Sequence, residues 1–272
     1  MNSLLPKIGI PAILLCALIP AVVHHGLAQT PKVPAANRTP VLVELFTSEG
    51  CSSCPPADDL LARFETEQPF NSADVVALEE HVDYFNHDGW IDPFSSADWT
   101  QRQFTYDNAL HAGTPSTPQA IVEGQRQLVG NDINSLAAAI RAVSELPQTP
   151  VTLLQKPSNS PDDPQFAVTV GKLVGATEKD NPEVWLLISE SGLHSAVDRG
   201  ENAGHDLHHS SVVRALKKVG VTALAASPQA FDGSTTIKLK SGWKRENLRA
   251  VALVQEKKSR KILGAAVLPL AN

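Results

Sequence analysis

Two cysteines separated by two residues, Cys51 and Cys54, constrain this chain most, because two different periodicities meet there. Residues 41–46, just before them, form a short apolar, β-rich run of the kind that makes a buried strand. After them, apolar residues recur at helical spacing, and Pro55 and Pro56 occupy the expected first turn, where a missing N–H is tolerated. The sequence therefore predicts a cysteine pair at the junction between a strand and a helix N-terminus.

That position favours a reactive dithiol. Free backbone N–H groups and the helix dipole stabilise an anion there, and they lower the pKa of a thiol. We expect Cys51, nearer the turn, to be the exposed nucleophile and Cys54, one helical turn on, to be the buried resolving thiol. Two alternatives stay open. A zinc site would need further ligands, and a structural disulfide over so short a loop would restrict little chain entropy.

The residues around the pair also resemble a known family. Residues 44–58 read Glu-Leu-Phe-Thr-Ser-Glu-Gly-Cys-Ser-Ser-Cys-Pro-Pro-Ala-Asp, which resembles the signature of the secreted "domain of unknown function 1223" family. Residues 199–204 and 212–214, Arg-Gly-Glu-Asn-Ala-Gly and Val-Val-Arg, resemble a second pattern of that family. The resemblance implies a thioredoxin-like fold, and it leaves the reaction open.

The N-terminus predicts export. Residues 1–28 fit a secretory signal peptide, with Lys7 before an apolar stretch at residues 8–23 and a small-x-small cleavage site at residues 26–28; a retained membrane helix is the alternative. We expect a periplasmic or secreted protein with no stable membrane anchor after cleavage. Cys16 would be removed with the signal peptide, so the remaining thiols would form the single Cys-x-x-Cys, which favours chemistry or metal binding over scaffolding.

The chain after the signal peptide divides into three expected parts. Residues 29–39 are proline-rich and predict a linker, and residues 40–147 alternate strands and helices, as in a thioredoxin-like α/β domain with a central mixed sheet flanked by helices. Beyond the prolines near residue 148 the period changes to two, which predicts a mainly β, sandwich-like domain over residues 148–272. Residues 210–218 fit either a helix or a strand. Asn131 is the expected N-cap of a helix at residues 133–144.

Two residue groups are expected to support the cysteines. Thr117 and Pro118 precede a short apolar strand and resemble the cis-proline loop of thioredoxin-like domains, which lies beside the dithiol and pairs with an extended substrate; Pro115 is the competing proline. Glu44 lies where many thioredoxins keep a buried carboxylate that accepts the proton of the resolving thiol, here Cys54. The alternative for Glu44 is a surface position at a strand edge.

The polar stretch at residues 199–214 is expected to pack beside the dithiol. There the Arg199 cation would favour the Cys51 thiolate, whereas in the alternative Arg199 pairs with Glu201 at the surface. The same stretch raises a metal hypothesis through three histidines, His205, His208 and His209. Solvated loop histidines are the plainer interpretation, and we expect no resident metal.

Charge and motif together predict the function class. The formal charge of −6 and the lack of a basic block argue against nucleic acid and anionic membrane surfaces as partners. We expect a thiol–disulfide oxidoreductase that needs no cofactor and acts on protein thiols or disulfides together with a redox partner. One alternative is a copper- or zinc-handling module that uses Cys51, Cys54 and a histidine such as His81. The other is a non-catalytic interaction protein.

Overall fold

The computed structural model describes residues 38–222 and 228–270. The expected signal peptide at residues 1–28 lies outside these ranges, as does the expected linker apart from its last two residues. The first strand already begins at the second of these, Thr39. Within the described ranges, no helix has both the length and the hydropathy that a membrane crossing requires.

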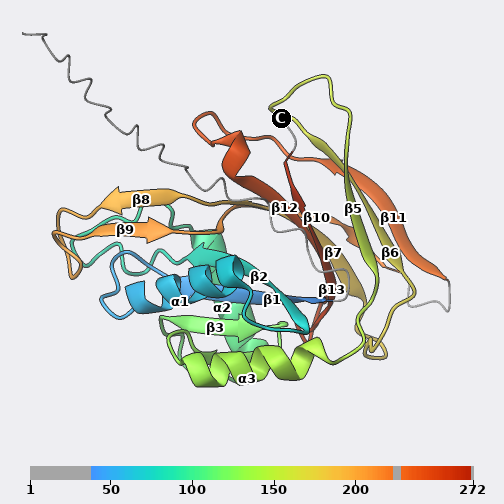
Figure 1. Cartoon of the computed structure of the whole chain (residues 1–272), viewed down its shortest axis with the longest axis horizontal. Helices are drawn as coiled ribbons and strands as arrows, with labels where there is room; N and C mark the ends of the chain where they lie inside the picture. The colour runs from blue at the N-terminus through green and yellow to red at the C-terminus, as the bar shows by residue number, and fades with distance from the viewer. Residues whose placement is uncertain (1–37, 223–227, 271–272) are drawn as a thin grey trace, which may run out of the picture. The chain divides into compact units, whose positions relative to one another are not determined.

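A large mixed sheet with few helices forms the architecture (Figure 1). Its eight strands run in the order β13-β12-β7-β10-β2-β1-β3-β4. In chain order their bounds are β1 Thr39–Thr47, β2 Ala73–His81, β3 Gln119–Val122, β4 Arg126–Val129, β7 Pro182–Glu190, β10 Val212–Val221, β12 Leu248–Glu256 and β13 Ile262–Pro269. A three-stranded sheet and a hairpin complete the β structure: β5 Val151–Lys156, β6 Gln165–Gly171 and β11 Gln229–Thr236, then β8 Leu193–Ala196 with β9 Asp206–His209.

Strands from both expected domains share the large sheet. The parallel pairing of Val212 on β10 with Glu79 on β2 joins them, and the Glu79 N–H donates to the carbonyl of Ser211 at 3.0 Å. The Pro-rich boundary therefore does not separate two sheets in the described chain. After this boundary, apolar and polar residues alternate because a different layer covers the sheet. Strands β5, β6 and β11, in place of helices, pack on the second half of the sheet through apolar residues such as Phe166 and Val168.

Helices cover both faces of the first half of the sheet: α1 Pro55–Glu67, α2 Ala97–Leu110 and α3 Ile133–Ser144. On β1, Val43 and Leu45 pack with α1 and α3, whereas Leu42 and Phe46 lie in clusters on the opposite face, which α2 covers. Burial on both faces explains why residues 41–46 are apolar except for Glu44.

Two local expectations are resolved by the backbone. Of residues 210–218, all from Val212 onward lie in β10, a strand that pairs antiparallel with β7, so the helical alternative was wrong. The N-cap of α3 is Asp132, whose carboxylate accepts the backbone N–H groups of Asn134 and Ser135, and the expected cap Asn131 was one residue early. A carboxylate cap also complements the positive end of the helix dipole.

A buried arginine ties α2 to three strands. Arg102 forms ion pairs with Glu44 on β1 and with Glu80 on β2, the latter at 3.2 Å, and it donates to Gln255 on β12 at 3.4 Å. It also donates to the hydroxyl of Tyr106, one turn further along α2, at 3.2 Å. Burial is the largest single influence on the pKa of Arg102 and lowers it, but Glu44, Tyr106 and Glu80 together raise it by more, so the net direction is upward. The cation is therefore held between two buried carboxylates.

We predict that Arg102→Ala lowers the free energy of unfolding by about 3–5 kcal/mol, because Glu44 and Glu80 would keep their burial and lose their cation. Chemical denaturation measured by circular dichroism tests this. Gln101→Ala, at the exposed neighbouring position of α2, is the control and should change stability by less than about 0.5 kcal/mol. Equal effects of the two substitutions would contradict the prediction.

Candidate functional site

The cysteine pair lies between the end of β1 and the start of α1, as the sequence predicts. Cys51 and Cys54 form a disulfide with a Cα–Cα distance of 5.5 Å, and Cys54 is the residue before the first turn of α1. Cys54 is fully buried, as expected. Cys51 is only 3% exposed, so the prediction that Cys51 is exposed was wrong for this oxidised form. The exposed residues of the motif are Ser52 and Ser53.

The loop between β8 and β9, residues 197–205, covers Cys51. The side-chain amide of Asn202 donates to the carbonyls of Glu49, at 2.8 Å, and Cys51, at 3.1 Å. The carboxylate of Glu201 accepts the N–H of Ser52 at 3.1 Å. The predicted packing of this polar stretch beside the dithiol is therefore confirmed. Figure 1 shows the hairpin of β8 and β9 reaching over α1, with which β9 is in contact.

Arg199 does not make the expected contact. Its side chain is exposed, and it borders a cavity of about 350 Å³ beside His87 and Trp90. In the described part of the chain, no hydrogen bond or ion pair joins it to the motif, and none joins it to Glu201. The contacts that Asn202 and Glu201 make with the cysteine motif were not predicted, although both residues belong to the same family-like pattern.

Glu44 is buried, but it faces away from α1. It lies on the face of β1 covered by α2, where Arg102 and Tyr106 hold its carboxylate. The buried carboxylate on the Cys54 side is instead Asp58, one helical turn after Cys54, which accepts the hydroxyl of Thr47 at 2.7 Å. Burial and the nearby charge of Glu79 raise the pKa of Asp58 to about 7. Asp58 is therefore a buried carboxylate on the α1 side of the sheet, whereas Glu44 lies on the α2 side.

The Pro118 loop lies next to the motif helix. The Thr117–Pro118 peptide bond is cis, as predicted. At Gly130 an added Cβ would come within 3.0 Å of Pro118 and 3.2 Å of Ala57, which shows how closely the loop approaches α1. Pro118 and Ser53 line the same cavity of about 340 Å³. The exposed side of the cysteine motif thus opens onto a groove.

Behind the motif lies a buried group of three residues, here called the histidine–glutamate cluster: Glu79, His81 and His209. Their potential ligand atoms all lie within 4.8 Å of one another. His209 lies on β9, where side chains alternate, so it faces inward while His208 faces solvent. His205 is exposed as well, and the three neighbouring histidines do not converge.

Two further carboxylates hold this cluster to the motif. The Glu49 carboxylate accepts the indole N–H of Trp90 at 2.7 Å and lies 3.0 Å from His209 Nε2. Asp92 lies 2.7 Å from His81 Nδ1 and accepts the Glu49 N–H at 2.9 Å. Sequence reasoning missed Glu49 and Asp92, because one reads as a turn residue and the other sits in an irregular aromatic segment.

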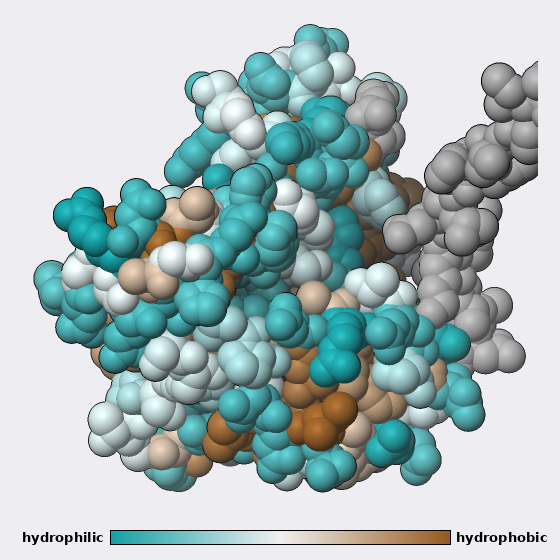
Figure 2. All heavy atoms as spheres, turned by 60° about the vertical axis from the view of Figure 1, so that its left-hand side comes forward, coloured by the Kyte–Doolittle hydropathy of each residue, from teal (hydrophilic) through white to brown (hydrophobic). Residues whose placement is uncertain are grey.

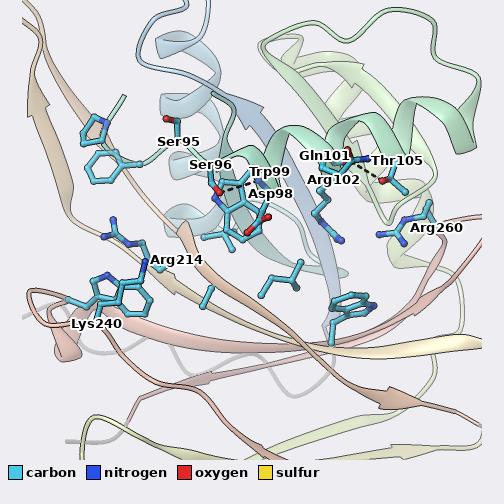
Figure 3. Close-up of a pocket in the computed structure, with 17 residues that line it drawn as sticks. Ser95, Ser96, Asp98, Trp99, Gln101, Arg102, Thr105, Arg214, Lys240 and Arg260 are labelled. Atoms are coloured by element: carbon cyan, nitrogen blue, oxygen red, sulfur yellow. Dashed lines mark hydrogen bonds between the residues drawn. The ribbon is translucent and has the colours of Figure 1, made fainter. Parts of the chain in front are cut away.

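A larger cavity of about 720 Å³ lies between α2 and β10 (Figure 3). Arg214 and Lys240 lie toward one end of it, and Arg102 and Arg260 toward the other. The Arg214 guanidinium also stacks 5.4 Å from the ring centre of Phe94. The outer face turned forward in Figure 2 is mostly hydrophilic, with hydrophobic residues in small groups. The groove and the cavity are therefore better candidate binding surfaces than that face.

Comparisons with known proteins agree with the family resemblance of the cysteine motif. The family described as "Protein of unknown function (DUF1223)" matches residues 42–255. A crystal structure of a protein from Agrobacterium tumefaciens is 27% identical, with a TM-score of 0.65, over 88% of this chain and 97% of its own. HBP35 of Porphyromonas gingivalis, 16% identical, has a TM-score of 0.63 over 86% of this chain and 76% of its own, a likeness of fold alone. No curated protein matches this chain.

We predict that Asp58 makes stability fall as pH rises from about 4 to about 7. In this window the folded state keeps the Asp58 proton that the unfolded state, with a pKa near 3.9, has already lost. Asp58→Asn removes the effect, so the stability difference between variant and wild type should shift by on the order of 4 kcal/mol in favour of the variant. Urea denaturation at several pH values measures this shift.

Asp59→Asn, at the exposed next position, is the matched control and should leave the pH profile unchanged. A wild-type profile parallel to that of Asp58→Asn would show that Asp58 has an ordinary pKa.

We also predict that Asn202→Ala speeds reduction of the Cys51–Cys54 disulfide by dithiothreitol about tenfold, because two hydrogen bonds that hold the covering loop on the motif are lost. Mass spectrometry of quenched, alkylated samples gives the rate. Asn134→Ala, at an exposed site on α3, should reduce at the wild-type rate. Unchanged reduction in Asn202→Ala would mean that the loop does not protect the disulfide.

Proposed function

The chain belongs to the DUF1223 family of proteins of unknown function, and from that premise we propose that it is a thiol–disulfide oxidoreductase. The observation that carries the proposal is the placement of Cys51 and Cys54 at the N-terminus of α1, beside an open groove. Backbone N–H groups at this end stabilise a thiolate, and the groove would bring an extended substrate beside Ser53, next to both cysteines. Displacement of the loop at residues 197–205 would then expose Cys51. The substrates are protein thiols or disulfides.

The exchange reaction needs only the two cysteines. In the reducing direction, the Cys51 thiolate attacks one sulfur of a substrate disulfide, forms a mixed disulfide and expels the other substrate sulfur as a thiolate. The Cys54 thiolate then attacks the Cys51 sulfur, which forms the Cys51–Cys54 disulfide and releases the second substrate thiolate. Two electrons pass to the substrate. The reverse sequence oxidises it, and a redox partner resets the pair.

Asp58 suits the proton transfer that this sequence requires. Cys54 must lose its proton before it can attack, and it lies fully buried. A carboxylate with a pKa of about 7, one helical turn away, can accept that proton near neutral pH and return it in the reverse direction. This is the role that the sequence assigned to Glu44.

The same proposal includes a thioredoxin-like assignment for residues 40–147. The strand and helix order β1-α1-β2-α2-β3-β4-α3 supports it, together with the parallel pairing of β1 with β2 and the antiparallel pairing of β1 with β3. Strands of the second half extend that sheet, and the loop between β8 and β9 covers the motif. We further propose export to the periplasm or medium, on the signal-peptide pattern of residues 1–28.

We predict that Cys54→Ser traps a mixed disulfide with a peptide that carries one disulfide bond, and that Cys51→Ser does not. Both variants are made with Cys16→Ser, so that no third thiol reacts. Without Cys54 the adduct on Cys51 cannot be resolved, so intact-mass spectrometry should find it as the main species. No adduct in Cys54→Ser, or equal adducts in both variants, would rule out the proposed roles.

A further inference from the structure

The histidine–glutamate cluster contains polar atoms that the fold leaves without partners. Among the described residues, no hydrogen bond reaches His81 Nε2, His209 Nδ1 or Glu79 Oε1, although all three atoms are buried. The two imidazole nitrogens point at one carboxylate: His81 Nε2 lies 3.9 Å and His209 Nδ1 lies 3.7 Å from Glu79 Oε2. These distances are too long for hydrogen bonds, and they leave space for a bridging cation.

The outer nitrogen of each ring fixes its orientation. His81 Nδ1 faces Asp92 at 2.7 Å, and His209 Nε2 faces Glu49 at 3.0 Å. When each ring donates its N–H to that carboxylate, the lone pair of the other nitrogen points into the cluster. A histidine that donates to a carboxylate on one side and offers a lone pair on the other is the usual arrangement of a metal ligand.

In the described chain, the carboxylates around the cluster also lack a lysine or arginine partner. Glu49, Glu79 and Asp92 are each at most 2% exposed. Within the described ranges, none of them forms an ion pair with lysine or arginine; histidine is their partner in each pair. Burying carboxylates without a compensating positive charge is costly. A divalent ion between the two unpartnered imidazole nitrogens and the Glu79 carboxylate would supply positive charge there.

We propose that Glu79, His81 and His209 bind a divalent transition-metal cation of the zinc class. Two imidazole nitrogens and one carboxylate oxygen form a recurrent ligand set for zinc, one that leaves a further coordination position. Asp92 and Glu49 orient the two imidazoles. The site uses neither cysteine, so it differs from the cysteine-based metal alternative of the sequence analysis and is independent of the proposed redox function.

A route toward the site is provided by the aromatic ring of Phe94. Its ring centre lies 5.5 Å from those of both His81 and His209, and Phe94 also lines the cavity of about 720 Å³ beside α2. Phe94 therefore borders both the cavity and the two histidine rings.

The test is a zinc titration of the chelator-treated full chain with its disulfide intact, followed by calorimetry and by thermal unfolding. We expect one zinc ion per chain and a rise in melting temperature. Glu79→Gln, which keeps the shape of the side chain, and His209→Gln should each weaken binding at least about 100-fold, whereas Asp92→Asn should weaken it about 10- to 100-fold. His208→Gln, on the exposed side of the same strand, should bind as wild type does.

Two controls separate this site from the cysteines. The triple variant Cys16→Ser, Cys51→Ser and Cys54→Ser should bind zinc with unchanged stoichiometry, and its cobalt complex should lack thiolate charge-transfer absorption. Folding of every variant is checked by circular dichroism. Should His209→Gln not fold, zinc binding by Asp92→Asn tests the proposal in its place. The proposal is overturned if zinc neither binds nor stabilises the wild-type chain, if Glu79→Gln and His208→Gln bind alike, or if the serine variant loses the site.

Discussion

The pairing of β2 with β10 is the contact on which the rest of the structure depends. A single parallel register, Val212 opposite Glu79, extends the sheet from the first half of the chain into the second. It sets where β9 ends, and so it places His209 beside His81, with ring centres 4.7 Å apart. The loop that precedes β9 then covers the cysteine motif. A shift of this register by one residue would turn the side chains of β10 to the other face and remove both arrangements.

Buried polar groups make the packing of these elements specific, at a cost in desolvation free energy. Arg102 connects α2 with Glu44 and Glu80, and Glu49 connects the motif with Trp90 and His209. Each carboxylate is stable inside only with its partners in place, because a lone buried charge costs several kcal/mol. An alternative packing of the two halves would break the contact of Glu49 with His209, whereas Arg102, Glu44 and Glu80 would keep theirs within the first half. The polar contacts therefore select one arrangement, whereas the apolar core alone would tolerate several.

Local structure followed from the sequence, and long-range pairing did not. Residues 41–46 and the prolines after Cys54 identified β1 and the start of α1, because period and backbone constraint act over a few residues. Alternation places Glu44 on one face of β1, but it does not tell which helix covers that face, so Asp58 was missed. His209 joined His81 only once β9 and β10 were placed. The shared sheet could not be foreseen, because strand period reports burial and not the identity of the neighbouring strand.

The cover over Cys51 comes from far along the chain. Asn202 lies 151 positions after Cys51, and closing so large a loop is entropically costly and slow compared with forming β1 and α1. A chain that emerges N-terminus first therefore presents its two thiols to solvent before the segment that shields them has been made. Oxidation of the cysteine pair can therefore precede the covering of Cys51 by the loop. Oxidants that are too large to reach the cysteines in the folded protein can act on the nascent chain.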